Sequence, residues 1–128
     1  MFLGTPHKGS AMAKLSQQTA ILWPTIEVKE LEDKSKQLIQ LNQEFLANIQ
    51  KLTKPIKIIS IAEGSTTKIL HVNLQIVPFD SAFLGVGNFY ISSENHLNLS
   101  KPVTKDSFLY TKIVKMIDQI LKEEKKDN

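Results

Sequence analysis

The sequence contains no cysteine and no arginine among its 128 residues. Without cysteine, the chain can form neither internal disulfides nor thiolate metal sites, although its redox compartment stays open. All sixteen basic residues are lysine, and they are interspersed with thirteen carboxylates. Because arginine supplies the bidentate fork that nucleic-acid recognition favours, and no zinc-finger or RNA-motif spacing occurs, we expect no nucleic-acid partner.

Long apolar runs are also missing. The run at residues 56–62 is far shorter than the roughly 18 residues that span a bilayer, and no N-terminal targeting signal is visible. We therefore expect these residues to be soluble or peripheral to a membrane. The three histidines, His7, His71 and His96, have no spacing typical of metal ligands. The sequence predicts neither a metal ion nor a cofactor.

The spacing of apolar residues predicts alternating strands and helices. Apolar positions three and four residues apart favour helices, whereas short β-branched or alternating runs favour strands. The expected elements are a two-residue strand at 2–3, helices at 10–23 and 35–52, strands at 56–62, 69–77 and 88–92, a helix at 105–122, and a frayed charged tail at 123–128. This order is typical of an α/β fold with a mostly parallel sheet and crossover helices.

The expected sheet is incomplete, because only two or three strands accompany a stub at residues 2–3. Parallel sheets need covering layers on both faces and neighbouring strands. We expect residues 1–128 to form the C-terminal portion of one larger domain whose upstream strands are absent. The strands at 2–3 and 56–62 should then have unpaired edges, and the chain should aggregate or be only marginally stable.

No serine occupies a nucleophile elbow, the Gly-x-Ser-x-Gly turn that exposes a catalytic hydroxyl in α/β hydrolases. The glycines stand at positions 4, 9, 64, 85 and 87, and none produces that pattern. Ser10 is better interpreted as a helix N-cap than as a nucleophile.

The other two members of a serine hydrolase triad do have candidates. In that architecture the acid follows one strand and the histidine follows a later one. His96 lies after the strand expected at 88–92, and Glu63 ends the strand expected at 56–62. Asp80 competes with Glu63 for the acid role, although it also suits the N-cap of a short helical turn. His7 and His71 are weaker candidates, because His7 lies beside a turn proline and His71 lies in an extended segment without a nearby acidic spacing.

Four segments resemble a known family. The segment FLGTPHKGS at residues 2–10 resembles the region after the sixth strand of lipase-like hydrolases. Blocks at 23–31, at 77–82 with 84–87, and at 95–102 with 106–110 resemble the serine active site-containing protein family, in the same order and at similar spacing. By position, His96, Glu63 and Asp80 match that family's late histidine and two acidic residues. The family's elbow lies upstream of the Pro6-His7 segment and has no counterpart here.

The resemblance implies an α/β-hydrolase fold and a lipid or ester substrate. It also implies phosphatidylglycerol remodelling, cholesterol trafficking and peripheral association with membranes where mitochondrion and endoplasmic reticulum meet. On this interpretation the chain is the C-terminal part of a serine-dependent lipid hydrolase or acyltransferase, and it needs the missing N-terminal part of the domain for activity. The alternative is a non-catalytic hydrolase-fold scaffold or lipid-binding protein.

Overall fold

The computed structural model describes residues 1–8, 28–69 and 71–126. Two sheets and three helices occupy these ranges. The elements are β1 (Phe2–Leu3), α2 (Val28–Ile49), β2 (Ile59–Glu63), β3 (Thr67–Ile69), β4 (Val72–Leu74), α3 (Phe79–Ala82), β5 (Asn88–Ser92) and α4 (Phe108–Glu124). The expected mixed α/β architecture with a mostly parallel sheet is confirmed in this coarse form, while the helix expected at 10–23 lies outside the described residues.

The principal sheet has the strand order β1-β2-β5, and both of its strand pairs are parallel. β2 is therefore the central strand. All five of its residues are buried, as expected for a parallel strand that is covered on both faces. The expectation that this strand would have an unpaired edge is wrong within the described residues, because β1 and β5 bond to its two sides. The predicted tendency to aggregate stays a prediction.

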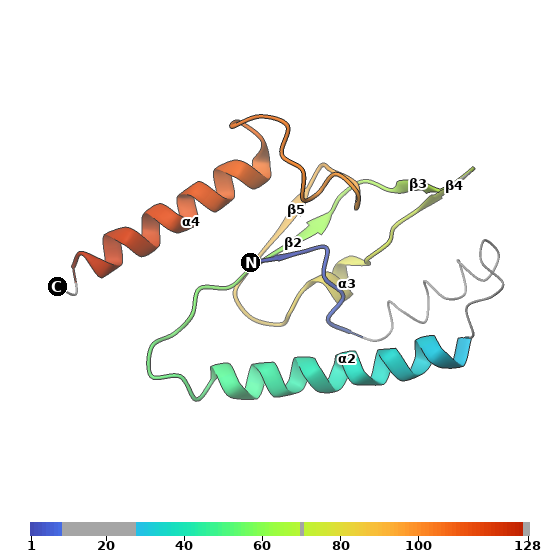
Figure 1. Cartoon of the computed structure of the whole chain (residues 1–128), viewed down its shortest axis with the longest axis horizontal. Helices are drawn as coiled ribbons and strands as arrows, with labels where there is room; N and C mark the ends of the chain where they lie inside the picture. The colour runs from blue at the N-terminus through green and yellow to red at the C-terminus, as the bar shows by residue number, and fades with distance from the viewer. Residues whose placement is uncertain (9–27, 70, 127–128) are drawn as a thin grey trace.

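Successive side chains of β2 point to opposite faces and contribute to two hydrophobic clusters. Ile59 and Ile61 pack with Leu99 and with Leu109 of α4, whereas Ala62 packs with Val77 and Ala82 on the other side. α2 joins the structure near β1, where the Phe2 and Phe45 rings meet edge to face at 6.0 Å. Figure 1 shows α2 and α4 on opposite sides of the strands, so the sheet has a helix on either side.

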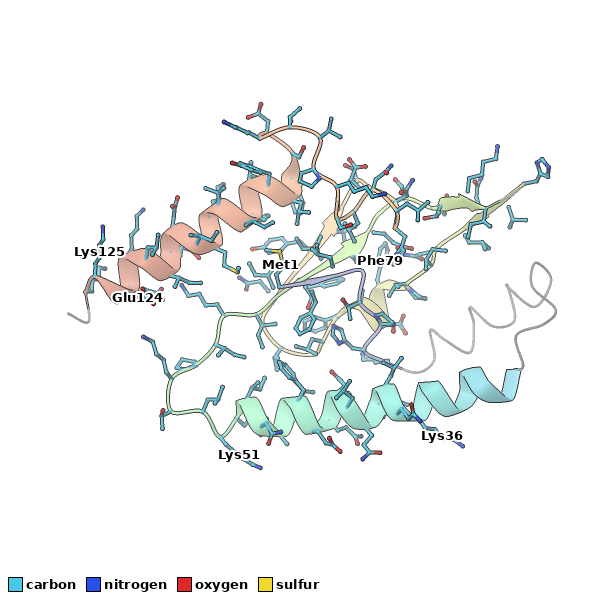
Figure 2. All side chains as sticks on the ribbon, viewed as in Figure 1. Met1, Lys36, Lys51, Phe79, Glu124 and Lys125 are labelled. Carbon is cyan, nitrogen blue, oxygen red and sulfur yellow. The ribbon has the colours of Figure 1, made fainter. Side chains whose placement is uncertain are left out.

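The helix boundaries differ from those expected because apolar stripes mark buried faces and not helix ends. α2 begins at Val28, seven residues before position 35, within a run of charged residues that favour helix without marking a core. It ends at Ile49, and Leu41 and Leu52, two of the regularly spaced apolar residues that predict the helix at 35–52, are exposed. Lys36 lies on the side of α2 that faces away from the strands (Figure 2).

α4 begins three residues later than the expected start at 105 and continues to Glu124. The helix therefore includes Glu123 and Glu124, two residues of the expected charged tail. Lys57 and Glu123 form an ion pair at 2.6 Å. The fraying of 123–128 stays a prediction. The strand expected at 88–92 is confirmed as β5.

Two strands differ from the sequence-based prediction. β2 starts at Ile59 and not at 56, because its partner β5 begins opposite Ile59 and offers no ladder further back. The single extended segment expected at 69–77 is instead an antiparallel hairpin, in which Thr67 lies opposite Leu74 and Ile69 opposite Val72. Figure 1 shows this β3–β4 hairpin extending away from the main sheet.

Candidate active site

Glu63 is the last residue of the central strand, and its side chain is fully buried. Both carboxylate oxygens have partners. Oε1 accepts hydrogen bonds from the backbone N–H groups of Ile76, at 2.5 Å, and Val77, at 3.1 Å. Oε2 lies 2.7 Å from Nδ1 of His96. Because a buried carboxylate is costly unless it is hydrogen-bonded, these three partners explain how the side chain is tolerated inside the protein.

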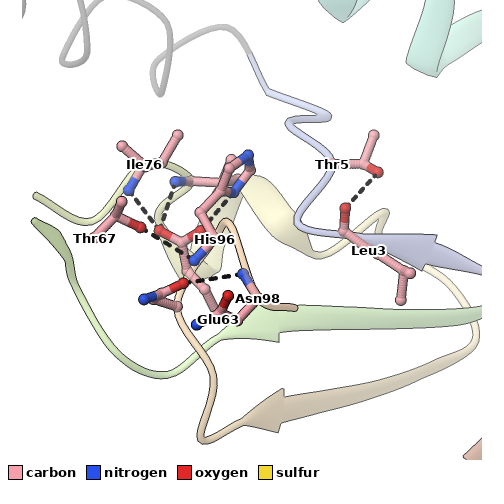
Figure 3. Close-up of polar contacts among 9 residues, drawn as sticks. Leu3, Thr5, Glu63, Thr67, Ile76, His96 and Asn98 are labelled. Carbon is pink, nitrogen blue, oxygen red and sulfur yellow. Dashed lines mark hydrogen bonds and ion pairs between the residues drawn. The ribbon is translucent and has the colours of Figure 1, made fainter. Parts of the chain in front are cut away.

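His96 follows β5, and its side chain is 33% exposed. A carboxylate can only accept hydrogen bonds, so Nδ1 carries a proton when it bonds to Glu63. Nε2 of the neutral ring is then an acceptor, and it points away from the carboxylate (Figure 3). One nitrogen is thus oriented by a buried acid, while the opposite nitrogen can take a proton from another group.

The loop that carries His96 is fixed at both ends. Asn95 accepts a hydrogen bond from the backbone N–H of Asn98 on its side-chain oxygen, at 3.0 Å, and its carbonyl accepts from Leu99 N, at 2.9 Å. Leu99 is buried in the core cluster beside α4. The turn therefore begins with a side-chain hydrogen bond, as Asn often provides, and ends with an apolar anchor.

Two glycines let other segments approach this pair closely. A Cβ atom at Gly4, whose φ is +52°, would lie 3.1 Å from Nδ1 of His96 and 3.2 Å from Leu99. A Cβ atom at Gly64 would lie 2.0 Å from the carbonyl oxygen of Ser92, too close for any other residue. The absence of side chains here allows the end of β1 to pack under the imidazole and the exits of β2 and β5 to lie together.

The expected contact between Glu63 and His96 is confirmed, and its catalytic role stays a prediction. Asp80 lies in α3 with an exposed side chain, and among the described residues Glu63 is the carboxylate bonded to His96. Asp80 is also not the N-cap of that turn, because Pro78 occupies the cap position. His71 is exposed near the hairpin turn, and Ser10 lies outside the described residues.

His7 is buried, only 7% exposed, and lies beside the Phe2 ring with centroids 4.8 Å apart. Burial lowers the pKa of His7, because desolvation disfavours the charged imidazole. Within residues 1–8, 28–69 and 71–126, its Nε2 has no hydrogen-bond partner. His7 and His96 therefore have different environments, and no acidic side chain in the described part of the chain bonds to His7.

Sequence reasoning missed three polar contacts of the pair. Thr67, at the start of β3, is 2% exposed and accepts a hydrogen bond from the backbone N–H of His96 on Oγ1, at 3.2 Å. The partners stand 29 positions apart, so no local pattern could have indicated the contact. The same holds for the donors Ile76 and Val77.

The arrangement can orient an imidazole for proton transfer. Across the described residues, no group of three or more histidine, cysteine or acidic side chains could hold a metal ion. No helix in the described part of the chain is long and apolar enough to cross a membrane.

Comparisons with known proteins identify related sequences. The chain is 40% identical to Protein SERAC1 of Danio rerio, 37% identical to that of Mus musculus and 36% identical to that of Homo sapiens, in each case over 123 residues. The match covers 94% of this chain but only 18% of each relative. No protein-family model and no solved structure matches the chain. The chain is thus homologous over most of its length to Protein SERAC1.

Proposed function

We propose that Glu63 and His96 are the acid and base of a serine-dependent ester hydrolase or acyltransferase. The observation that supports this most strongly is their 2.7 Å hydrogen bond, formed where the neighbouring parallel strands β2 and β5 reach their carboxyl ends. In α/β hydrolases the acid precedes the histidine along the chain, and this sequence has the same order. The fold proposed is accordingly the C-terminal part of an α/β hydrolase.

The proposed chemistry uses each atom of the pair for one task. His96 Nε2 accepts the hydroxyl proton of a serine as that serine attacks an ester carbonyl, and later returns the proton to the leaving alkoxide. Glu63 Oε2 holds the Nδ1–H tautomer and stabilises the imidazolium that forms. The serine belongs to a part of the protein outside these 128 residues, because the chain has no elbow of its own.

The substrate class is a lipid ester. The resemblance of the sequence to the serine active site-containing protein family supports this proposal. The homologous proteins are over five times as long as this chain, which covers 18% of each. Phosphatidylglycerol remodelling, cholesterol trafficking, and action on the membranes of mitochondrion and endoplasmic reticulum are parts of the same proposal.

The test is a chimera in which this chain replaces the matched region of Danio rerio Protein SERAC1. We expect the chimera to hydrolyse short-chain esters and to release acyl chains from phosphatidylglycerol vesicles. Glu63→Gln and His96→Gln should each lower kcat by roughly 10³–10⁴-fold, the scale on which triad members act. Glu94→Gln, which changes an exposed carboxylate of the same loop, is the matched control.

Three results would contradict the proposal. The first is a His96→Gln chimera that keeps full activity. The second is a loss of activity that Asp80→Asn causes and Glu63→Gln does not. The third is a chimera that turns over no ester and reacts with no fluorophosphonate although it folds. That last result would favour the non-catalytic scaffold or lipid-binding function.

A further inference from the structure

We propose that the β3–β4 hairpin is a positioning element that holds Glu63 and His96 in one fixed relation. The hairpin residues do not touch the reacting atoms. Instead, the two ends of the hairpin bond to different members of the pair: its first residue bonds to the backbone of His96, and the residues just after its last strand bond to the carboxylate of Glu63. The catalytic consequence rests on the function proposed above, whereas the geometry does not.

The first end of the hairpin fixes the base. Thr67 opens β3, is 2% exposed, and accepts the backbone N–H of His96 on its hydroxyl oxygen. It lies opposite Leu74, the last residue of β4, which is 6% exposed. The base of the hairpin is thus buried on both strands, and the hydroxyl has little freedom to move independently of the ladder.

The second end fixes the acid. Ile76 and Val77 lie two and three residues after the end of β4, and both donate their backbone N–H groups to the same oxygen of Glu63. Val77 is 4% exposed and packs with Ala62 and Ala82. With Oε1 fixed by two backbone donors, the rotation of the carboxylate is set, and Oε2 can only face His96.

The segment that contains the hairpin therefore starts at Glu63 and returns to bond with the side chain of Glu63. Residues 64–77 leave the end of β2 at Glu63 and return to the carboxylate of that same residue. Figure 3 shows the Ile76, Thr67 and His96 contacts gathered around Glu63. Movement of the hairpin base would break the contacts to the acid and to the base together.

The described residues of the hairpin tip make no such contribution. Lys68, His71, Val72 and Asn73 are all exposed, and the tip projects away from the principal sheet (Figure 1). The positioning role is thus confined to the buried base. Substitutions at Thr67 and at its exposed neighbour Thr66 should separate the effect of the buried hydroxyl from that of an exposed one.

Hydrogen exchange on the unmodified 128-residue chain tests the linkage without any variant. A single opening of the hairpin base would expose the amide N–H groups of Ile76, Val77 and His96 to water together. Their protection factors should therefore agree within about threefold, as those of one cooperative unit do. Protection of His96 that differs from that of Ile76 and Val77 by tenfold or more would overturn the proposal.

A matched set of substitutions tests the hydroxyl itself. Thr67→Val keeps the shape and removes the acceptor, Thr67→Ser keeps the acceptor, and Thr66→Val changes an exposed residue one position earlier. The readout is the exchange of the ring Nδ1–H proton of His96 with water, followed by NMR. We expect exchange to be faster by roughly threefold to tenfold in Thr67→Val, the equilibrium equivalent of one lost hydrogen bond. Thr67→Ser and Thr66→Val should resemble the parent.

Unchanged ring-proton exchange in Thr67→Val would overturn the proposal, and so would equal acceleration in Thr66→Val. Should Thr67→Val fail to fold, the amide protection of the unmodified chain still decides. Neither measurement uses ester turnover, so an inactive chimera would refute the proposed function and leave this test standing. If the hairpin links Glu63 and His96 in a protein that hydrolyses no ester, it positions the pair for some other purpose.

Discussion

Replacing Glu63 by alanine or by glutamine separates the structural part of the site from its proton chemistry. Alanine removes the acceptor of two backbone N–H groups, those of Ile76 and Val77, in a position with no exposure to solvent. Glutamine is nearly isosteric and keeps a carbonyl oxygen where Oε1 lies. Its NH₂ group, however, faces Nδ1 of His96, so the imidazole must accept there and carry its proton on Nε2.

The expected free energies follow from these contacts. A buried donor left without a partner costs about 1–3 kcal/mol. Glu63→Ala removes the partner of two donors, the backbone N–H groups of Ile76 and Val77, and should therefore lower the free energy of unfolding by roughly 2–6 kcal/mol. Glu63→Gln keeps both donors bonded to a neutral acceptor and should cost only about 1 kcal/mol. Alanine should therefore be far more disruptive to folding than glutamine, although both remove the negative charge.

Urea unfolding of the 128-residue chain, followed by circular dichroism, measures the difference. Glu94→Ala removes an exposed carboxylate two positions before His96 and should leave the free energy of unfolding nearly unchanged. The reasoning would be refuted if Glu63→Ala and Glu63→Gln had equal stabilities, because the hydrogen bonds from the two backbone donors to Glu63 would then contribute nothing to the free energy of unfolding. An alanine variant as stable as the parent would refute it more strongly.

Three further predictions concern other residues. Gly4→Ala should lower the free energy of unfolding in urea by roughly 1–3 kcal/mol, because the new methyl group combines a left-handed backbone with crowding against His96; a variant of parental stability would contradict this. Since burial lowers the pKa of His7, the unfolded chain binds more protons below about pH 6.5. Stability should therefore be complete above that pH and fall as the pH drops below it. His7→Phe should flatten this dependence in urea titrations at several pH values and His71→Gln should not, whereas identical slopes in the parent and His7→Phe would refute the cause. The 128-residue chain alone should hydrolyse no ester and take up no fluorophosphonate; stoichiometric labelling of Ser10 or any other serine would overturn the assignment of the nucleophile to another part of the protein.

The sequence predicts the elements that depend on local pattern. The β-branched residues 56–62 indicate the central strand, and 88–92 indicate β5 with its observed bounds. Because the acid and the histidine follow two different strands, their chain order also predicts the contact between Glu63 and His96. Parallel strands bring their carboxyl ends to one edge of the sheet, so this contact needs little beyond the order of the elements.

The support around the pair could not be predicted, because it depends on contacts between distant segments. Between Ile69 and Val72 the sequence has none of the glycine or asparagine that marks a tight hairpin, so residues 69–77 resemble one extended segment. The hydroxyl of Thr67 bonds a backbone group 29 residues away. Gly4 is recognisable as a turn residue, but its closeness to the imidazole exists only after β1 pairs with β2.

The orientation of the His96 ring by Glu63 is the central claim, and the ¹⁵N chemical shifts of the two ring nitrogens test it most directly. We expect that, under conditions where the imidazole is neutral, Nδ1 is protonated and hydrogen-bonded while Nε2 is bare and able to accept a proton. In Glu63→Gln the two assignments should exchange. A parent chain with the proton on Nε2, or in rapid exchange between both nitrogens, would contradict the claim that Glu63 prepares His96 to act as a base.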